Sequence, residues 1–293
     1  NVLGAIDFNI LMMLAGTMGT VSLFIASKMP NRLAELILQR TPNVMWVVVA
    51  MSLFAGIVSA FVDNVATVLM IAPVGLAIAK KLNISPVTML ICIAVSSNLQ
   101  GAATLVGDTT SILLGGYAGM DFMDFFWMNG KPSIFFAVEL GALFTVPVIM
   151  FLFRNQREPV EIDEHTDVTD YVPTILLGAT VVLLIAASFL PHKPAMMNGI
   201  ICMGLFIIGA IYSIIRNKNT DLFRQALSEI DYETLMLLAG LFVVIGGITE
   251  AGIIDEISKL FVRVGGTNPF VLFTILVWGS VLISAFVDNI PYV

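Results

Sequence analysis

The hexapeptide Ser59-Ala-Phe-Val-Asp-Asn64 occurs twice in this chain, because residues 284–289 repeat it without a change. Each copy ends an apolar run, so an acidic and an amide side chain directly follow a stretch long enough to enter a bilayer. A second block, residues 6–16, reappears with conservative changes at 230–240. The offsets of the two blocks, 225 and 224 residues, are nearly equal and indicate an internal duplication.

Composition places the duplication in a membrane protein. Hydrophobic residues make up 58% of the 293 residues, charged residues only 12%, and the mean hydropathy is +0.96. A soluble domain carries roughly 25% charged residues. Since lipid tolerates only helices or closed barrels and the apolar runs have helical lengths, the sequence predicts an all-α polytopic membrane protein.

The predicted spans follow from the charge-free runs. A helix needs about 20 apolar residues to cross the hydrocarbon core. The expected membrane segments are 8–27, 41–62, 64–79, 82–120 with a polar interruption, 132–153, 172–190, 195–215, 234–249 and 269–287. Three further segments, 32–40, 221–229 and 255–263, are expected to be amphipathic helices at the membrane surface.

The second copy is expected to be inverted relative to the first. If Asp63-Asn64 is the tip of a re-entrant hairpin, the chain crosses five times between the two repeat starts, or seven times if both hairpin limbs span fully. Both counts are odd, which makes the copies antiparallel. Ten of the 14 basic residues fall on one side of this map, which is therefore predicted to be cytoplasmic.

This map divides the chain into a first repeat (1–153), a cytoplasmic connecting loop (154–171) and a second repeat (172–293). The acidic run in the loop is interpreted as solvated and is given no chemistry. Neither copy has every element of the other, so a fragment truncated at both ends is expected. A polar interruption is expected beyond Val293 in the natural chain.

The hairpin tip is the first candidate site. Asp63 and Asn64 lie between two apolar limbs, and an intramembrane carboxylate indicates function by default. The alternative is a turn between two full spans, in which these side chains cap the next helix in water. The short second limb and the recurrence as Asp288-Asn289 favour the functional interpretation.

The polar interruption is the second candidate. Hydroxyl, amide, glycine and carboxylate groups occur together at expected membrane depth in Ser97, Asn98, Gly101, Thr104, Gly107, Asp108 and Thr109. A broken helix exposes carbonyls that suit a cation and N–H groups that suit an anion or polar solute. Asp108 could also simply cap the helix from Thr109, and the two roles are compatible.

Other candidates are weaker. Glu139 interrupts an apolar span and either handles protons or bonds a neighbouring helix. Cys92 and Cys202 lie in apolar runs and are expected to be buried, inert thiols. No cofactor, nucleic-acid partner or metal site is expected beyond a possible sodium site at Asp63, Asn64, Ser97 and Asn98.

These motifs resemble the ion transporter superfamily with a citrate-transporter-like domain. It includes dicarboxylate/sodium symporters, arsenite permeases and NhaD-type sodium–proton antiporters. Its hairpin-tip signature is similar to Asp63-Asn64 with Thr67, and to Asp288-Asn289. Its broken-helix signature is similar to Ser97-Asn98, Gly101, Thr104 and Gly107-Asp108. The resemblance covers nearly the whole chain and implies inverted repeats, often assembled as homodimers.

The resemblance implies an ion-coupled permease working by alternating access in a bacterial plasma membrane, with Na⁺ or H⁺ as coupling ion and a small ion or solute as cargo. Dicarboxylate symporters carry Ser-Asn-Thr at the tip and Pro-Pro-Asn after the loop glycine, whereas this chain has Asp63 and Asp108 there. This favours the cation–proton branch and leaves sodium-coupled carboxylate symport open, since bound cations invert the local charge. An intramembrane aspartyl enzyme is a distant alternative that lacks its Gly-x-Gly-Asp context.

Overall fold

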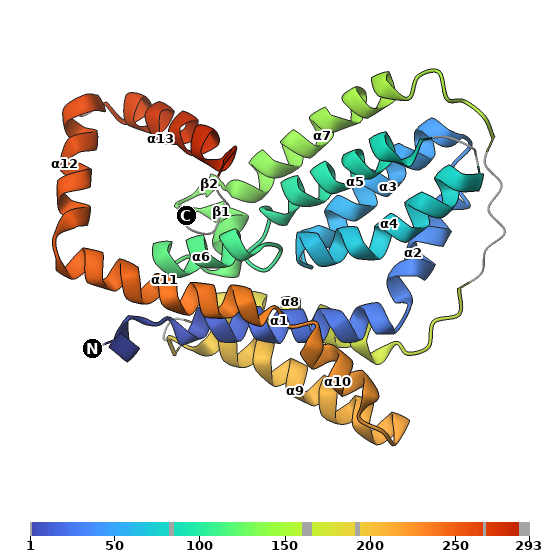
Figure 1. Cartoon of the computed structure of the whole chain (residues 1–293), viewed down its shortest axis with the longest axis horizontal. Helices are drawn as coiled ribbons and strands as arrows, with labels where there is room; N and C mark the ends of the chain where they lie inside the picture. Colours follow the sequence, from blue (N-terminus) through green and yellow to red (C-terminus); the bar gives the residue numbers. More distant parts are fainter. Residues whose placement is uncertain (1, 82–84, 160–165, 191–193, 266–267, 287–293) are drawn as a thin grey trace.

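A computed structural model describes residues 2–81, 85–159, 166–190, 194–265 and 268–286. This part of the chain is mainly helical, with one antiparallel pair of two-residue strands (Figure 1). The elements are η1 (Val2–Ala5), α1 (Phe8–Ala26), α2 (Met29–Leu38), α3 (Val44–Ser59), α4 (Asn64–Lys81), α5 (Pro86–Gly101), α6 (Thr109–Ala118), η2 (Phe122–Phe125), β1 (Trp127–Met128), β2 (Lys131–Pro132), α7 (Ile134–Leu152), α8 (Val172–Ser188), α9 (Met197–Asn217), α10 (Asp221–Ser228), α11 (Tyr232–Glu250), α12 (Ile253–Gly265) and α13 (Pro269–Ser284).

The helices confirm an all-α polytopic membrane architecture. Four described helices, α1, α7, α9 and α11, are long and apolar enough to cross a membrane. The hairpin limb α3 has 16 residues, or about 24 Å at 1.5 Å per residue, which is short of a full crossing of about 30 Å. The predicted interruption is present, because α5 ends at Gly101 and α6 begins at Thr109.

Most of the helices belong to two bundles that face each other. One contains α3, α4, α5 and α7, and the other contains α1, α8, α9 and α10 (Figure 1). The first bundle is held by an apolar cluster in which Val47, Val48 and Met51 of α3 are completely buried. In the second bundle Gly16 lets α1 approach α9, because a Cβ there would lie 2.4 Å from the backbone carbon of Cys202. Small residues allow this close approach in lipid, where packing replaces the hydrophobic effect.

The two sequence copies fold into the same order of elements. The helices α1, α2 and α3 correspond to α11, α12 and α13. Asp7 and Asp231 cap α1 and α11, and a residue with positive φ, Lys28 or Gly252, follows each helix. Because Tyr232 begins α11 beside the second half of α1, whereas Gly246 reaches Ala5 before α1, the paired helices run in opposite directions. The division of the whole chain into two inverted repeats stays a prediction.

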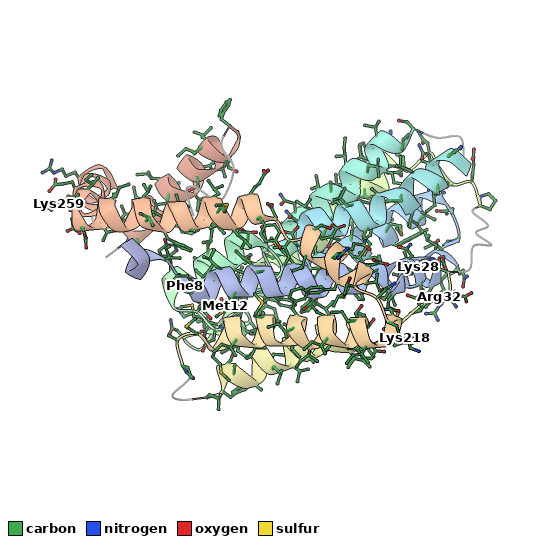
Figure 2. The ribbon with its side chains drawn as sticks, turned by 60° about the horizontal axis from the view of Figure 1, so that its bottom comes forward. Phe8, Met12, Lys28, Arg32, Lys218 and Lys259 are labelled. Carbon is green, nitrogen blue, oxygen red and sulfur yellow. The ribbon has the colours of Figure 1, made fainter. Side chains whose placement is uncertain are left out.

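Basic side chains gather at one end of the molecule. Lys28, Arg32 and Lys218 lie together there, whereas Phe8 and Lys259 lie toward the other end (Figure 2). Residues 166–170 of the connecting loop are held at the same end, because Thr169 bonds the backbone oxygen of Ser27 and Asp170 pairs with Arg216 at 2.5 Å. Basic residues mark the cytoplasmic side, which is the side predicted for this loop.

Candidate functional site

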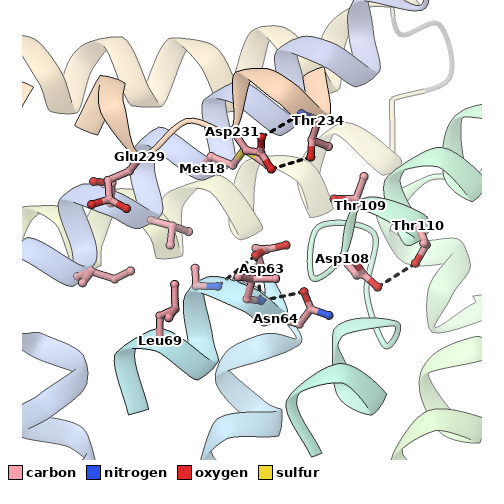
Figure 3. Close-up of a pocket in the computed structure, with 15 residues that line it drawn as sticks. Met18, Asp63, Asn64, Leu69, Asp108, Thr109, Thr110, Glu229, Asp231 and Thr234 are labelled. Carbon is pink, nitrogen blue, oxygen red and sulfur yellow. Dashed lines mark hydrogen bonds between the residues drawn. The ribbon is translucent and has the colours of Figure 1, made fainter. Parts of the chain in front are cut away.

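A pocket of about 410 Å³ lies where the two bundles face each other. We call it the site pocket. Four segments line it: the second half of α1, the hairpin tip with α4, the start of α6, and the α10–α11 junction (Figure 3). Its lining residues are Met18, Val21, Ser22, Ile25, Asp63, Asn64, Val65, Ala66, Leu69, Asp108, Thr109, Thr110, Glu229, Asp231 and Thr234. The volume is within the range of small-solute sites, roughly 300–1,000 Å³.

Asp63 is both a helix cap and a pocket wall. Its Oδ2 accepts hydrogen bonds from the backbone N–H groups of Val65 at 3.0 Å and Ala66 at 3.2 Å. Its Oδ1 accepts no hydrogen bond from the described residues and is available to a ligand. Asp63 therefore caps α4 with one of its two carboxylate oxygens, which is the capping part of the alternative in which this pair forms a turn in water.

The depth of Asp63 argues against an aqueous turn. A small void beside it is lined by Leu14, Thr17 and Met18 of α1. These residues lie near the middle of α1, which runs from Phe8 to Ala26 and is long enough to span a bilayer. Asp63 is thus level with the middle of a spanning helix, where an intramembrane carboxylate is a candidate functional group by default.

The hairpin tip is bonded directly to the end of α5. The amide Nδ2 of Asn64 donates to Oδ1 of Asn98 at 2.6 Å, and the hydroxyl of Ser97 donates to the Asn64 carbonyl at 3.2 Å. Thr67 is fully buried and donates to the Val62 carbonyl at 3.4 Å, within the tip itself. Ser97, Asn98 and Thr67 therefore shape the tip and do not line the pocket.

The interruption between α5 and α6 wraps around the end of α3. The hydroxyl of Thr104 donates to the Ala60 carbonyl. A Cβ added at Gly107 would lie 2.4 Å from the Gly101 carbonyl oxygen, 2.6 Å from that of Ser59 and 2.7 Å from that of Ala60. Only glycine fits this close approach of three carbonyls. Thr104, Gly101 and Gly107 therefore hold the interruption against the end of α3.

Asp108 and Thr109 line the pocket, as predicted. Asp108 occupies the cap position of α6, but its carboxylate makes no hydrogen bond to the backbone there. Instead Oδ2 accepts from the Thr110 hydroxyl at 2.9 Å (Figure 3). Side-chain capping of α6 by Asp108 was the wrong alternative, and the carboxylate lies in the wall of the same pocket as Asp63, turned toward Thr110 (Figure 3).

Sequence reasoning missed the acids of the α10–α11 junction. Glu229 and Asp231 line the pocket with Asp63 and Asp108. Hydrogen bonds from the Thr234 hydroxyl at 2.6 Å and its backbone N–H at 2.9 Å lower the pKa of Asp231. The repeated block is the sequence feature that could have pointed to Asp231, because Asp231 is the counterpart of Asp7. No Lys, Arg or His lines this pocket among the described residues.

Two buried polar atoms near the tip were also missed. The Ser59 hydroxyl and the Gln100 side-chain oxygen are buried without a hydrogen-bond partner in the described part of the chain. Ser59 lies against Gly101, where an added Cβ would be 3.3 Å from its Oγ. A buried unpaired oxygen costs about 1–3 kcal/mol, so these atoms indicate a water or ion between α3 and α5.

The remaining predicted residues lie elsewhere. Asp288 and Asn289 fall outside the described residues. Glu139 is half-buried on α7 and is not among the residues that line the pocket. Cys92 and Cys202 are free and buried, as predicted. No group of three or more His, Cys, Asp or Glu side chains in the described segments could hold a transition metal.

Comparisons with known proteins agree with this architecture. A family described as citrate transporter, CitMHS, matches residues 1–293. A 46 kDa membrane protein of Mycobacterium leprae is 31% identical over 80% of this chain and 54% of its own length. An uncharacterized transporter of Mycobacterium tuberculosis is 29% identical over 84% of this chain and 57% of its length. The human P protein is 24% identical over 98% of this chain and 43% of its length.

The chain spans about half the length of the first of these relatives. The apolar helices and the transporter relatives show an integral membrane protein, and the bacterial relatives support a bacterial plasma membrane. The family description and the name of the Mycobacterium tuberculosis relative are those of transporters and not of enzymes, which argues against the aspartyl-enzyme alternative. This chain, with its hairpin tip and broken helix around an acidic pocket, belongs to the citrate transporter family CitMHS.

Proposed function

We propose that this chain forms the ion-coupling part of a secondary transporter that works by alternating access, with Na⁺ or H⁺ as the coupling ion. The observation that carries the proposal is the unpaired Oδ1 of Asp63 in a pocket level with the middle of α1. A carboxylate at that depth is unfavourable unless it holds a cation or a proton.

The oxygen donors around the tip fit a sodium ion. The Ser59 hydroxyl has no hydrogen-bond partner among the described residues and lies beside Gly101 of the interruption. Hard cations prefer such uncharged and carboxylate oxygens. Asp63, Asn64, Ser97 and Asn98 would support this site, with Asp63 supplying the negative charge. Protonation of Asp63 is the alternative form of the same coupling.

The cargo is proposed to be a small carboxylate such as citrate, as the family description suggests. Four carboxylates line the pocket, so an anion is expected to enter only with cations or protons that neutralise them. The acidic lining specifically favours a second candidate, cation–proton antiport without an anion. The homodimer implied by the resemblance stays a prediction, which cross-linking of the full-length protein in membranes can test.

The experiment reconstitutes the full-length protein in liposomes with imposed sodium or pH gradients and offers citrate, dicarboxylates or no solute. Asp63→Asn is expected to abolish gradient-driven transport, because it removes the charge that binds the ion. Asp167→Asn, an exposed acid in the connecting loop, is the matched control and is expected to transport normally. Unchanged transport by Asp63→Asn would refute the coupling role.

The two cargo candidates separate in the same assay. Citrate accumulation that requires a sodium or proton gradient supports symport. Sodium efflux driven by a pH gradient in the absence of any solute supports antiport. Gradient-independent flux of every solute would contradict secondary active transport.

A further inference from the structure

Three cavities follow one another along the seam between α1 and α6. The site pocket occupies one end. A pocket of about 250 Å³, here called the outer vestibule, occupies the other end, and its lining includes Asp7, Ile10, Ile112, Ala195 and Asn198. A void of about 10 Å³ lies between them.

The order of the lining residues shows that the cavities are in line. On α1, Ile10 lines the outer vestibule, Leu14 the void, and Met18 both the void and the site pocket. These residues are four apart and share one helix face. At 1.5 Å per residue, Ile10 and Met18 are separated by about 12 Å along the helix. On α6, Ile112 lines both the outer vestibule and the void.

The layer between the two larger pockets is apolar and tightly packed. Leu14 and Ile112 are each 2% exposed and Val106 is 4% exposed, and all three belong to one hydrophobic cluster. Two glycines of α6 keep this seam narrow. A Cβ at Gly115 would lie 2.3 Å from Leu105, and one at Gly116 would lie 2.4 Å from Ile10.

The outer vestibule is at the end of α1 away from the basic cluster of Lys28 and Arg32 (Figure 2). Its polar lining, which includes Asp7 and Asn198, is compatible with water. The site pocket reaches Ile25 near the cytoplasmic end of α1. The two pockets therefore approach the same carboxylates, Asp63 and Asp108, from opposite sides of the membrane.

We propose that the α1–α6 seam is the translocation path, and that Leu14, Val106 and Ile112 form the apolar barrier that closes it in the state described here. This inference rests on the proposed transport function and deepens it. An apolar constriction excludes ions by dewetting, since an ion there loses its hydration. Because Ile112 lines both the outer vestibule and the void, and Met18 lines both the void and the site pocket, a shift of α6 along α1 that moves these side chains connects the site to the outer vestibule.

The test compares two neighbouring residues in full-length protein reconstituted in liposomes. Ile112→Ala removes side-chain volume from the barrier, whereas Leu113→Ala removes it from an equally buried position (2% exposed) that lines none of the three cavities formed by the described residues. Sodium and proton flux are measured without any solute.

Ile112→Ala is expected to raise this leak by about tenfold, which corresponds to a barrier lowered by about 1.4 kcal/mol. Leu113→Ala is expected to leak like the unmodified protein. Equal leaks from both variants, or an Ile112→Ala variant that leaks no more than the unmodified protein, would overturn the barrier. If the proposed transport function is wrong, the unmodified protein shows no gradient-driven uptake. That result is distinct from the result that would overturn the barrier.

Cysteine labelling locates the two pockets independently of leak. With Cys92 and Cys202 replaced by alanine, Ala195→Cys is expected to react with an impermeant thiol reagent from outside, and Ile25→Cys from the cytoplasmic side. Labelling of both positions from one side would contradict a path that opens to opposite faces.

Discussion

The two copies of the repeated block have the same local structure and different surroundings. Helices α1 and α11 have 19 residues each, and α3 and α13 have 16 each. Yet α3 has eleven buried residues, whereas α13 has none among the residues described. Equivalent sequences therefore form equivalent helices wherever they lie. Burial depends on which other helices are beside them.

Gly16 and Gly240 occupy the same place in the repeated block. Alanine substitutions at these two positions are expected to show the largest difference in stability between the two copies. Gly16→Ala is expected to destabilise the protein by about 1–3 kcal/mol, since its Cβ would lie 2.4 Å from the α9 backbone. At Gly240 nothing described lies within 4 Å, so Gly240→Ala is expected to be neutral or stabilising by up to about 1 kcal/mol.

Thermal unfolding of the full-length variants in detergent measures both effects. Equal losses at the two positions would show that α11 packs as closely against another segment as α1 packs against α9.

Asn43 and Asn268 are equivalent positions at which substitutions are expected to change stability by the same amount in both copies. Each caps its helix, with the side chain accepting a backbone N–H at 3.1 Å in α3 and 3.0 Å in α13. Because a cap is a local interaction, alanine at either position is expected to cost about 1 kcal/mol. The same unfolding assay applies. A cost confined to Asn43 would mean that burial, and not the local bond, stabilises these helix starts.

Glu35 and Lys259 occupy equivalent places on the amphipathic helices, but only Glu35 is buried. Burial disfavours its carboxylate, yet hydrogen bonds from Thr166 and the nearby Arg32 outweigh this and lower the pKa of Glu35. A lowered folded pKa means that the contribution is complete above the unfolded value of 4.5 and is lost as the pH falls through the folded value.

The loop around Thr166 is therefore expected to open more easily below about pH 4.5, which hydrogen exchange of its amides against pH measures. In Glu35→Gln this acid dependence is expected to disappear. An identical pH profile in that variant would assign the effect to another group.

The smallest changes in stability are expected for substitutions at Lys28 and Gly252. Both have positive φ, 59° for Lys28 and 71° for Gly252. The left-handed conformation disfavours a side chain by about 1–2 kcal/mol, while glycine adds unfolded-state entropy. Lys28→Gly is expected to raise stability by a few tenths of a kcal/mol up to about 1 kcal/mol, and Gly252→Ala to lower it similarly. Changes of the same sign in both variants would contradict a shared turn.

Much of the fold could be predicted from local pattern. The apolar runs, the break before Asp108 and the amphipathic helices all lie where the sequence indicates, because lipid requires every spanning segment to be helical. Part of the site could be predicted in the same way, since a polar motif inside an apolar run is already unusual. Asp63, Asp108 and Thr109 line the pocket accordingly.

The rest of the site depends on contacts between distant segments. Asp231 reaches the pocket because α11 runs back along α1, and Thr67 does not because its hydroxyl bonds within the tip. Ser59 and Gln100 carry buried oxygens that have no hydrogen-bond partner in the described segments, and these oxygens lie where α3 and α5 pack together.

The sequence alone therefore determined the membrane class, the helices and the duplication, since these depend on hydropathy and on patterns between residues a few positions apart. Only the tertiary structure decided which acids share a pocket, which glycines must stay glycine, and where an apolar layer separates two cavities. Those features depend on how helices far apart in sequence pack, and single-sequence patterns do not encode that geometry locally.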